Sequence, residues 1–207
     1  NAIIGFSEVI EQGFYGAVGH AKYVEYAHDI NEAGRSLHGK IGDILEFANI
    51  EAGRYPIEPK AIDVGKIVEE CAGECAGKAF SRRIALNLGF MAAAEALADP
   101  LAVKRIVNSL LSNALLYTQE GGQVRLEVHE EEGAVVVSVA DNGIGFTRVE
   151  AATAGLPFRS HARPGATTGM GMGLTIAMAL ARRMGGAIRI GGPAGEGTVA
   201  ELRLSKL

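Results

Sequence analysis

Apolar residues recur at the spacing of a helix over the first quarter of the chain. Residues 1–11 alternate apolar and polar side chains at helical period, and three glycines at 13, 16 and 19 then interrupt the pattern. A longer helix is predicted from 20 to 52, because two columns of apolar or small residues repeat there at intervals of seven. The two columns are Tyr23, Ile30, Leu37 and Ile44, and Ala27, Gly34, Ile41 and Ala48.

Two such columns are typical of the seam of a coiled coil or an antiparallel bundle. A hairpin of two helices cannot bury both columns by itself, so the pattern favours a partner. The simplest partner is a second copy, and we expect a homodimer through residues 1–52 that forms a four-helix bundle. The alternative is that the long helix packs on the neighbouring domain.

The pattern changes at Gly53-Arg54-Tyr55-Pro56, which together with Pro59 indicates a linker and a hinge over 53–60. We therefore expect two domains, 1–55 and 56–207. Asp63 and Asp99 are predicted N-caps, and Pro100 suits the first turn that follows Asp99. Further helices are predicted at 63–79, 100–117 and 172–184, and strands at 83–89, 123–129, 134–140, 187–191 and 197–204. Residues 147–168 are predicted to form a short helix and a mobile loop. This order predicts an α+β fold with a mixed sheet.

The strand at 134–140 is a continuous apolar run, which predicts burial on both faces. It leads directly into Asp141-Asn142-Gly143-Ile144-Gly145-Phe146. The Asp141 carboxylate can accept a hydrogen bond from an exocyclic amine, and the glycines let the backbone approach a flat base. Taken alone, Asp-Asn-Gly is also a good hairpin turn.

A second glycine cluster follows about two dozen residues later, Gly169-Met170-Gly171-Met172-Gly173-Leu174. It opens a helix, where free N–H groups and the positive end of the dipole suit phosphate. The cluster could instead begin a dinucleotide fold, but no strand immediately precedes it. With Asn113 on an upstream helix, the two clusters together predict a nucleotide pocket.

Composition and charge narrow the class of protein. At 207 residues with 48% hydrophobic content, the chain can bury a sizeable core. A net charge of −4 with scattered Lys and Arg predicts no nucleic-acid partner. No apolar stretch is long enough to span a membrane, so we expect no membrane contact within these residues. Cys71 and Cys75 are predicted to be small buried or half-buried thiols in a reducing cytoplasm. Because the chain begins Asn1-Ala2-Ile3-Ile4, we expect a cytoplasmic fragment of a longer protein.

The order of the motifs resembles the core of two-component sensor histidine kinases. That core is a HisKA dimerisation hairpin followed by an ATP-binding domain of the GHKL type, which is shared with gyrase B, Hsp90 and MutL. Residues 108–114 stand where the family's N box lies, 141–145 resemble its G1 box, 157–158 the remnant of its F box and 169–174 its G2 box. Residues 195–198 resemble its final turn, and 1–7 and 50–53 resemble the ends of its hairpin. Residues 14–16 and 26–30 are similar to the alphaproteobacterial cell-cycle kinases of the PleC, DivJ and DivL kind.

The resemblance implies ATP and Mg²⁺ as cofactors and a role for each motif. Asp141 would bind the adenine amine, with Gly143 and Gly145 shaping the base pocket. Asn113 would ligate Mg²⁺ through its amide oxygen, and Tyr117 would pack on the adenine ring. The residues expected at the phosphates and the lid are Gly169, Gly171, Gly173 and Leu174. Without the resemblance, Tyr117 would be taken as a core aromatic and Asn113 as a solvated helix residue.

Three positions depart from the family pattern. Ser109 replaces an Asn, Leu116 replaces a Lys that reaches toward phosphate, and Gly155 replaces the first aromatic residue of the F box. Positive charge in the lid could come instead from Arg159, His161 and Arg163.

The family's acceptor His has no counterpart among the five histidines of the chain. Asn1 resembles the last residue of the acceptor motif, so we expect that His about one heptad upstream. We interpret His28 as a helix-surface imidazole. The resemblance implies transfer of the ATP γ-phosphoryl to that His and then to the Asp of a response regulator or a phosphotransfer protein.

Two other functions are considered. A pseudokinase scaffold would dimerise and bind a regulator with weak or no phosphoryl transfer, and Ser109, Leu116 and Gly155 favour it. A mismatch-repair or topoisomerase ATPase would carry a Glu base in the N box, which is missing here.

Overall fold

The computed structural model describes residues 2–147, 150, 153–159, 171–192 and 195–207. Contacts divide the chain into two compact units, Asn1–Glu46 and Phe47–Leu207. The predicted domains meet at residues 55 and 56, whereas this division falls inside the long second helix. The packing of the last turn of that helix, described below, accounts for the difference.

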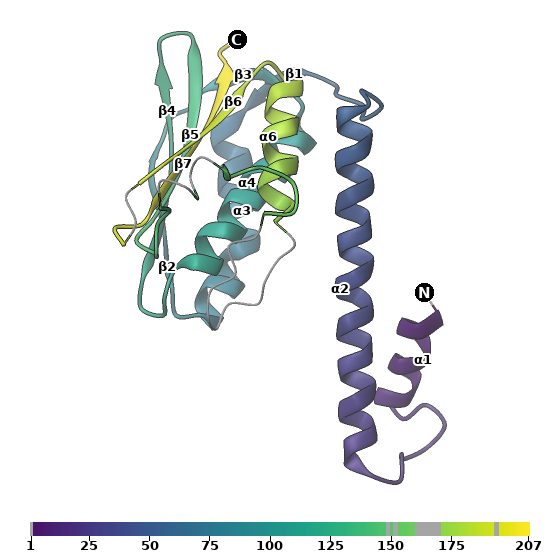
Figure 1. The fold of residues 1–207 in the computed structure, drawn as a ribbon. Coiled ribbons are helices and arrows are strands. Elements are labelled where there is room, and N and C mark those ends of the chain that lie inside the picture. Colours follow the sequence, from purple (N-terminus) through teal and green to yellow (C-terminus); the bar gives the residue numbers. More distant parts are fainter. Residues whose placement is uncertain (1, 148–149, 151–152, 160–170, 193–194) are drawn as a thin grey trace. The chain divides into compact units, whose positions relative to one another are not determined.

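The first unit contains α1 (Ala2–Glu11) and most of α2 (Ala21–Glu51), close to the two predicted helices (Figure 1). Ala27 of α2 is buried at 3% exposure. The other predicted column stays between 38% and 59% exposed, at Tyr23, Ile30, Leu37 and Ile44. A large apolar face of α2 is therefore uncovered within one copy, and the dimeric bundle remains a prediction.

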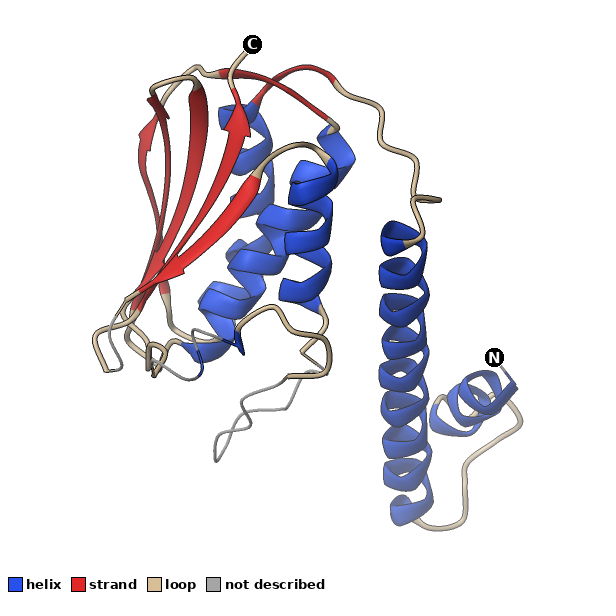
Figure 2. Ribbon diagram, turned by 45° about the horizontal axis from the view of Figure 1, so that its top comes forward, coloured by secondary structure: helices blue, strands red, loops and turns tan. Residues whose placement is uncertain are grey.

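In the described part of the second unit, a five-stranded sheet and three helices form two layers. The helices cover one face of the sheet (Figure 2). The strand order is β2-β4-β5-β7-β6, with β2 and β4 parallel and the other neighbours antiparallel. The predicted α+β fold with a mixed sheet is confirmed. The strands are β2 (Ala85–Met91), β4 (Gln123–Glu131), β5 (Ala134–Asp141), β6 (Ala187–Gly191) and β7 (Thr198–Ser205). The helices are α3 (Val64–Ser81), α4 (Pro100–Tyr117) and α6 (Gly173–Arg183).

A second, two-stranded sheet was not predicted. It pairs β1 (Lys60–Asp63) with β3 (Glu95–Ala98) in antiparallel fashion. Each strand has only four residues, too few for a clear alternation of apolar and polar positions. The predicted linker over 53–60 therefore includes Lys60, which is the first residue of β1.

Both predicted N-caps are present. The Asp63 carboxylate accepts a hydrogen bond from the Lys66 N–H at 3.2 Å. One oxygen of Asp99 accepts from the N–H groups of Leu101 and Ala102, and the other accepts from the Glu58 N–H at 2.8 Å. Burial raises the pKa of Asp99, but these backbone donors outweigh it and hold the pKa below its ordinary value. Asp99 thus caps α4 and also fixes the predicted linker to the second unit.

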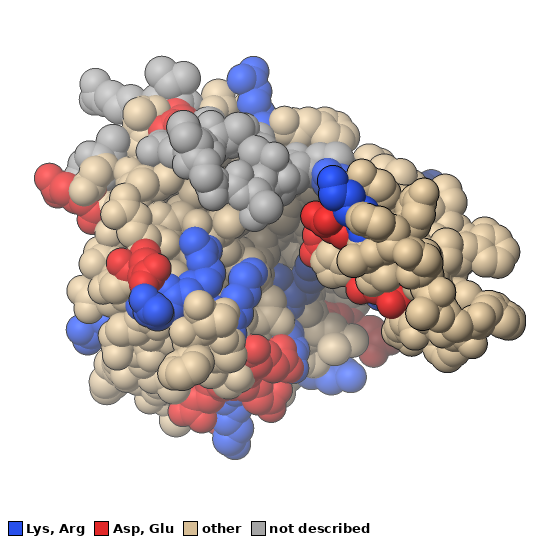
Figure 3. Space-filling view, turned by 90° about the horizontal axis from the view of Figure 1, so that it is seen from below, with Lys and Arg blue, Asp and Glu red and all other residues tan. Residues whose placement is uncertain are grey.

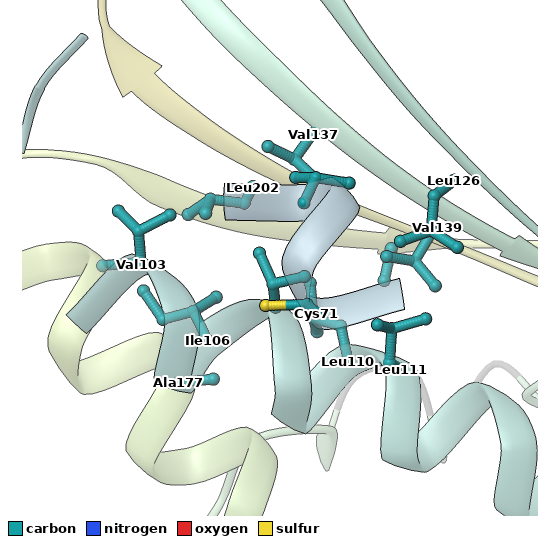
Figure 4. Packing of buried hydrophobic residues seen from close by; sticks show 14 of the residues in the cluster. Cys71, Val103, Ile106, Leu110, Leu111, Leu126, Val137, Val139, Ala177 and Leu202 are labelled. Atoms are coloured by element: carbon teal, nitrogen blue, oxygen red, sulfur yellow. The ribbon is translucent and has the colours of Figure 1, made fainter. Parts of the chain in front are cut away.

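The core lies between the sheet and its helices, as the side chains of Figure 4 show. Central strand β5 is buried from Val135 to Val139, which confirms the predicted burial on both faces. Cys71 lies in this core, and burial raises its pKa to about 12. Cys75 is half-buried, so the prediction of two small buried or half-buried thiols is confirmed.

The last turn of α2 belongs to the second unit. Ile50 is 1% exposed and packs in the same core cluster, and Phe47 and Tyr55 pack against that cluster. The neighbouring Glu51 pairs with Arg182 at the end of α6, at 3.2 Å. Ile50 is therefore a core residue of the second unit, although it lies at the end of a helix that is mostly in the first.

Charge is mixed on one face of the molecule. Lys and Arg lie interspersed with Asp and Glu on the face drawn in Figure 3, as their scatter along the sequence indicated. Within the described part of the chain, no helix combines the length and the hydropathy needed to cross a membrane.

Removing the side chain of Ile50 tests whether the last turn of α2 packs in the core of the second unit. Ile50→Ala should lower the free energy of unfolding of the second unit by about 2–5 kcal/mol, because a fully buried side chain is truncated. The matched control is Leu101→Ala, since Leu101 is 74% exposed; it should change stability by less than about 0.5 kcal/mol. Urea unfolding of the whole chain measures both. Equal effects would contradict the assignment of Ile50 to the core.

Candidate nucleotide-binding site

A recess opens between α4, the ends of β5 and β7, and the start of α6. Its empty volume is about 370 Å³, a figure that includes open solvent at its mouth. The wall is mostly apolar with a few polar groups, as such sites require. The lining residues are Leu110, Asn113, Ala114, Tyr117, Val139, Asp141, Phe146, Leu174, Ile190, Thr198 and Ala200.

Four of the predicted site residues meet in this recess, although they are distant in sequence. Asn113 and Tyr117 come from α4, where a spacing of four residues puts them on one helical face. Asp141 is the last residue of β5, and Leu174 lies in the first turn of α6. The fold therefore collects an amide, an aromatic ring and a carboxyl group around one cavity.

The Asp141 carboxyl group has a pKa above its ordinary value. Burial raises the pKa of its carboxyl group, and hydrogen bonds from the Gly143 N–H and from the backbone and side chain of Thr198 offset this only in part. The Gly143 bond is 2.8 Å long. None of the described lining residues is a Lys or Arg, so none of them supplies a positive charge that would compensate for the burial of Asp141.

The glycines after Asp141 are needed for close backbone packing. A Cβ at Gly143 would lie 2.5 Å from the Tyr117 carbonyl oxygen, too close for any side chain. Gly197, before β7, likewise leaves no room beside the Asp141 carbonyl, and Gly145 has φ +64°. Gly143 thus packs on the end of α4, and the expected approach of these two glycines to a base stays a prediction. Neither Gly143 nor Gly145 lines the recess.

The start of α6 borders the recess through Leu174. Gly171 has φ +69°, and no side chain among the described residues caps the helix. Uncapped N–H groups at this end fit a phosphate. Gly171 and Gly173 do not line the recess itself. Gly169 lies outside the described residues.

The three departures from the family pattern have distinct surroundings. Ser109 is buried, its Oγ has no hydrogen-bond partner among the described residues, and it lies 3.0 Å from where a Cβ of Gly173 would be. Leu116 is half-buried and does not line the recess. At Gly155 the Met178 thioether occupies the space of a side chain. Arg159 is exposed, whereas residues 161 and 163 lie outside the described part of the chain.

Sequence reasoning missed several lining residues, of which Thr198 matters most. Thr198 faces Asp141 across the β5–β7 pair and donates to it. The sequence indicates Thr198 only as part of a terminal turn, because its pairing with Asp141 joins positions 57 residues apart. Phe146 and Ile190 are ordinary apolar residues in the sequence and carry no signal of a site.

Comparison with known proteins agrees with this geometry. The model of the family described as "Histidine kinase-, DNA gyrase B-, and HSP90-like ATPase" matches residues 98–207. This range contains every predicted residue of the recess and more than half of the chain. The chain belongs to this family of ATPases, whose domain implies ATP binding.

The relatives narrow the class to a histidine kinase core. The cell-division control histidine kinases PdhS of Brucella anthropi and Brucella suis are both 31% identical over 98% of this chain. The chain spans about a fifth of the length of these relatives, at 20% and 21%.

Solved structures show the same fold. The crystal structure of full-length ShkA in complex with AMPPNP has a TM-score of 0.81 and 25% identity, over 99% of this chain and 42% of that one. The Acinetobacter baumannii histidine kinase AdeS has a TM-score of 0.69 and 14% identity, over 98% of this chain and 94% of that one.

A substitution at Gly143 tests the close packing beneath the recess. Gly143→Ala should lower the free energy of unfolding by about 1–3 kcal/mol, because the methyl group must displace the Tyr117 carbonyl. The control, Gly73→Ala, lies in α3 where a Cβ meets nothing within 4 Å, and it should stabilise by about 0.5–1 kcal/mol. Thermal unfolding compares the two. An unchanged free energy of unfolding in Gly143→Ala would contradict the close approach of Gly143 to the Tyr117 carbonyl.

Proposed function

We propose that this chain is the core of a protein histidine kinase in a two-component system. It holds ATP with Mg²⁺ in the recess and passes the γ-phosphoryl to a His on the dimerisation helix, upstream of residue 1. A response-regulator Asp or a phosphotransfer protein then receives it. The observation that carries this proposal is the convergence of Asn113, Tyr117 and Asp141 on one recess.

Each residue has a physical task in this proposal. The Asp141 carboxyl group accepts a hydrogen bond from the adenine amine, which adds a partner to a group that burial has left under-compensated. The Tyr117 ring offers the base an apolar face. The uncapped start of α6 attracts phosphate through its N–H groups.

Mg²⁺ fits the donor set at one point, the amide oxygen of Asn113, since this hard cation prefers oxygen ligands. When bound, it would neutralise phosphate charge. No basic residue among the described lining residues shares that role.

The partners follow from the same proposal. Residues 1–52 form a homodimer, because a second copy would cover the exposed column of α2. The site of action is the cytoplasm, where ATP is available. Similarity to cell-division control histidine kinases favours a kinase of the alphaproteobacterial cell-cycle kind.

The alternative is a pseudokinase scaffold that dimerises and binds a regulator with little or no phosphoryl transfer. One observation favours it. Leu116 stands where the family has its Lys, and no lining residue of the described part supplies that charge. A lost charge-assisted hydrogen bond is worth about 1.5–3 kcal/mol, so phosphate should be held weakly.

Replacing Asp141 separates binding from stability. Asp141→Asn should weaken ATP affinity roughly 10- to 100-fold, because the adenine amine loses its acceptor. The pKa of the Asp141 carboxyl group is raised in the folded wild type. The wild type therefore loses stability as pH rises from the ordinary pKa of Asp to the folded value. Because Asn carries no such charge, Asp141→Asn should be at least as stable as the wild type at pH 7. Calorimetry and thermal unfolding measure the two effects.

Asp99→Asn is the control with the opposite sign. The pKa of the Asp99 carboxyl group is lowered in the folded wild type. Its contribution to stability is therefore present above the ordinary pKa of Asp and is lost as pH falls through the folded value. This variant should destabilise by about 1–3 kcal/mol at pH 7 and leave ATP affinity unchanged. Unchanged ATP affinity in Asp141→Asn would contradict its assigned role.

Labelled phosphate distinguishes the kinase from the scaffold. In the full-length protein with Mg²⁺ and γ-labelled ATP, we expect incorporation of label that is stable to base and labile to acid, as a phosphohistidine is. The Asp141→Asn variant should incorporate none at the same ATP concentration. Nucleotide binding without any incorporation would favour the scaffold. Absence of ATP binding at millimolar concentration would exclude the kinase.

A further inference from the structure

A buried polar cluster joins α1 to α2 inside the first unit. Ser7 and Asn31 are only 3% and 7% exposed. The Asn31 Nδ2 donates to the Ile4 carbonyl at 3.1 Å and to the Ser7 Oγ at 3.3 Å, and the Ser7 Oγ itself donates to the Ile4 carbonyl at 2.8 Å. The buried amide thus finds its partners on the other helix, as a buried polar group requires.

The other end of the Asn31 amide is also occupied. Its Oδ1 accepts from the Arg35 Nε at 2.7 Å, and the Arg35 guanidinium lies 3.6 Å from the Glu8 carboxylate on α1. On the same face of α2, the His28 Nδ1 pairs with Glu11 at 2.8 Å, and this bond raises the pKa of His28. Three positions of α2, spaced three and four residues apart on one face, therefore contact α1 through polar groups.

A steric notch lies beside the polar cluster. A Cβ at Gly34 would lie 2.8 Å from the Ile4 Cγ1, so the Ile4 side chain uses the space that the glycine leaves. If α1 slid by one helical turn, about 5.4 Å, Asn31 would lose the Ser7 hydroxyl and be left partly unpaired. The polar contacts and the Ile4–Gly34 contact thus favour the same register.

We propose that Asn31 is a positioning residue that fixes the register of α1 on α2. A single polar residue inside a helical interface is known to specify register at some cost in stability. Through α1, the register sets the height and the rotation of any helical stretch that is continuous with α1 on its N-terminal side. The catalytic consequence rests on the proposed function, which places the phosphoryl acceptor on that stretch, whereas the register itself does not depend on it.

Distances within the first unit test the register. The variant Ser7→Ala with Asn31→Leu removes the polar pair but keeps side chains that can pack, and Ser36→Ala on the exposed part of α2 is the control. Spin labels are placed at Ile3→Cys and His38→Cys, with Cys71→Ala and Cys75→Ala in all samples. Dilution with unlabelled protein restricts the signal to one copy.

The wild type and the Ser36→Ala control should each give one narrow distance. The double variant should remain helical by circular dichroism but give a broadened distribution, or one shifted by about 5.4 Å. An unchanged narrow distance in the double variant would overturn the proposal.

Kinetics of the full-length protein test the catalytic consequence. The double variant should lower the kcat of autophosphorylation roughly 10- to 100-fold, because a misplaced acceptor loses its alignment with the donor. Its KM for ATP should not change, since the recess lies in the second unit. A shifted distance with unchanged kcat would overturn the positioning role. If the wild type bound no ATP, the proposed function would fail, and the distances would still decide the register.

Discussion

The second unit depends on a buried central strand that ends in a carboxyl group. Strand β5 carries five successive buried residues, Val135 to Val139, and has neighbours on both edges. The strand direction then places Asp141 where the sheet ends and α4 passes close by. Burial there raises the pKa of the Asp141 carboxyl group, and donors from the Gly143 N–H and from Thr198 are arranged around it. The same strand therefore organises the hydrophobic core and presents an acceptor to the recess.

The recess owes its shape to packed backbone more than to loops. Gly143 brings the turn after β5 against the Tyr117 carbonyl, and Gly197 brings the start of β7 against Asp141. The Ile144 N–H also bonds to the Tyr117 carbonyl at 3.4 Å. These contacts join α4, β5 and β7 at one point, so the Tyr117 side chain is held by rigid elements. Positions on rigid elements are what a precise binding site needs.

The sequence predicted those features whose signals are local. Asp63 and Asp99 marked two helix starts because an N-cap acts within three residues, and β5 was found because burial on both faces leaves an unbroken apolar run. Asp141, Asn113 and Tyr117 were found through motif order. Thr198 was missed because its role comes from strand pairing over a long separation, and the β1–β3 pair was missed because each strand is too short for a period to appear. Ile50 was assigned to the helical hairpin because helical periodicity does not reveal which of two cores a residue joins.

The two units use buried polar groups in opposite ways. Asn31 has partners for both ends of its amide within the protein, so it can specify how two helices meet. Asp141 has donors that only partly offset its burial, and the Ser109 hydroxyl near the uncapped start of α6 has no partner among the described residues. A satisfied polar group adds nothing by binding a ligand, whereas an under-compensated one gains by it. The incomplete satisfaction around the recess is therefore a physical reason to place ligand binding there, and the complete satisfaction around Asn31 is a reason to give that cluster a structural task.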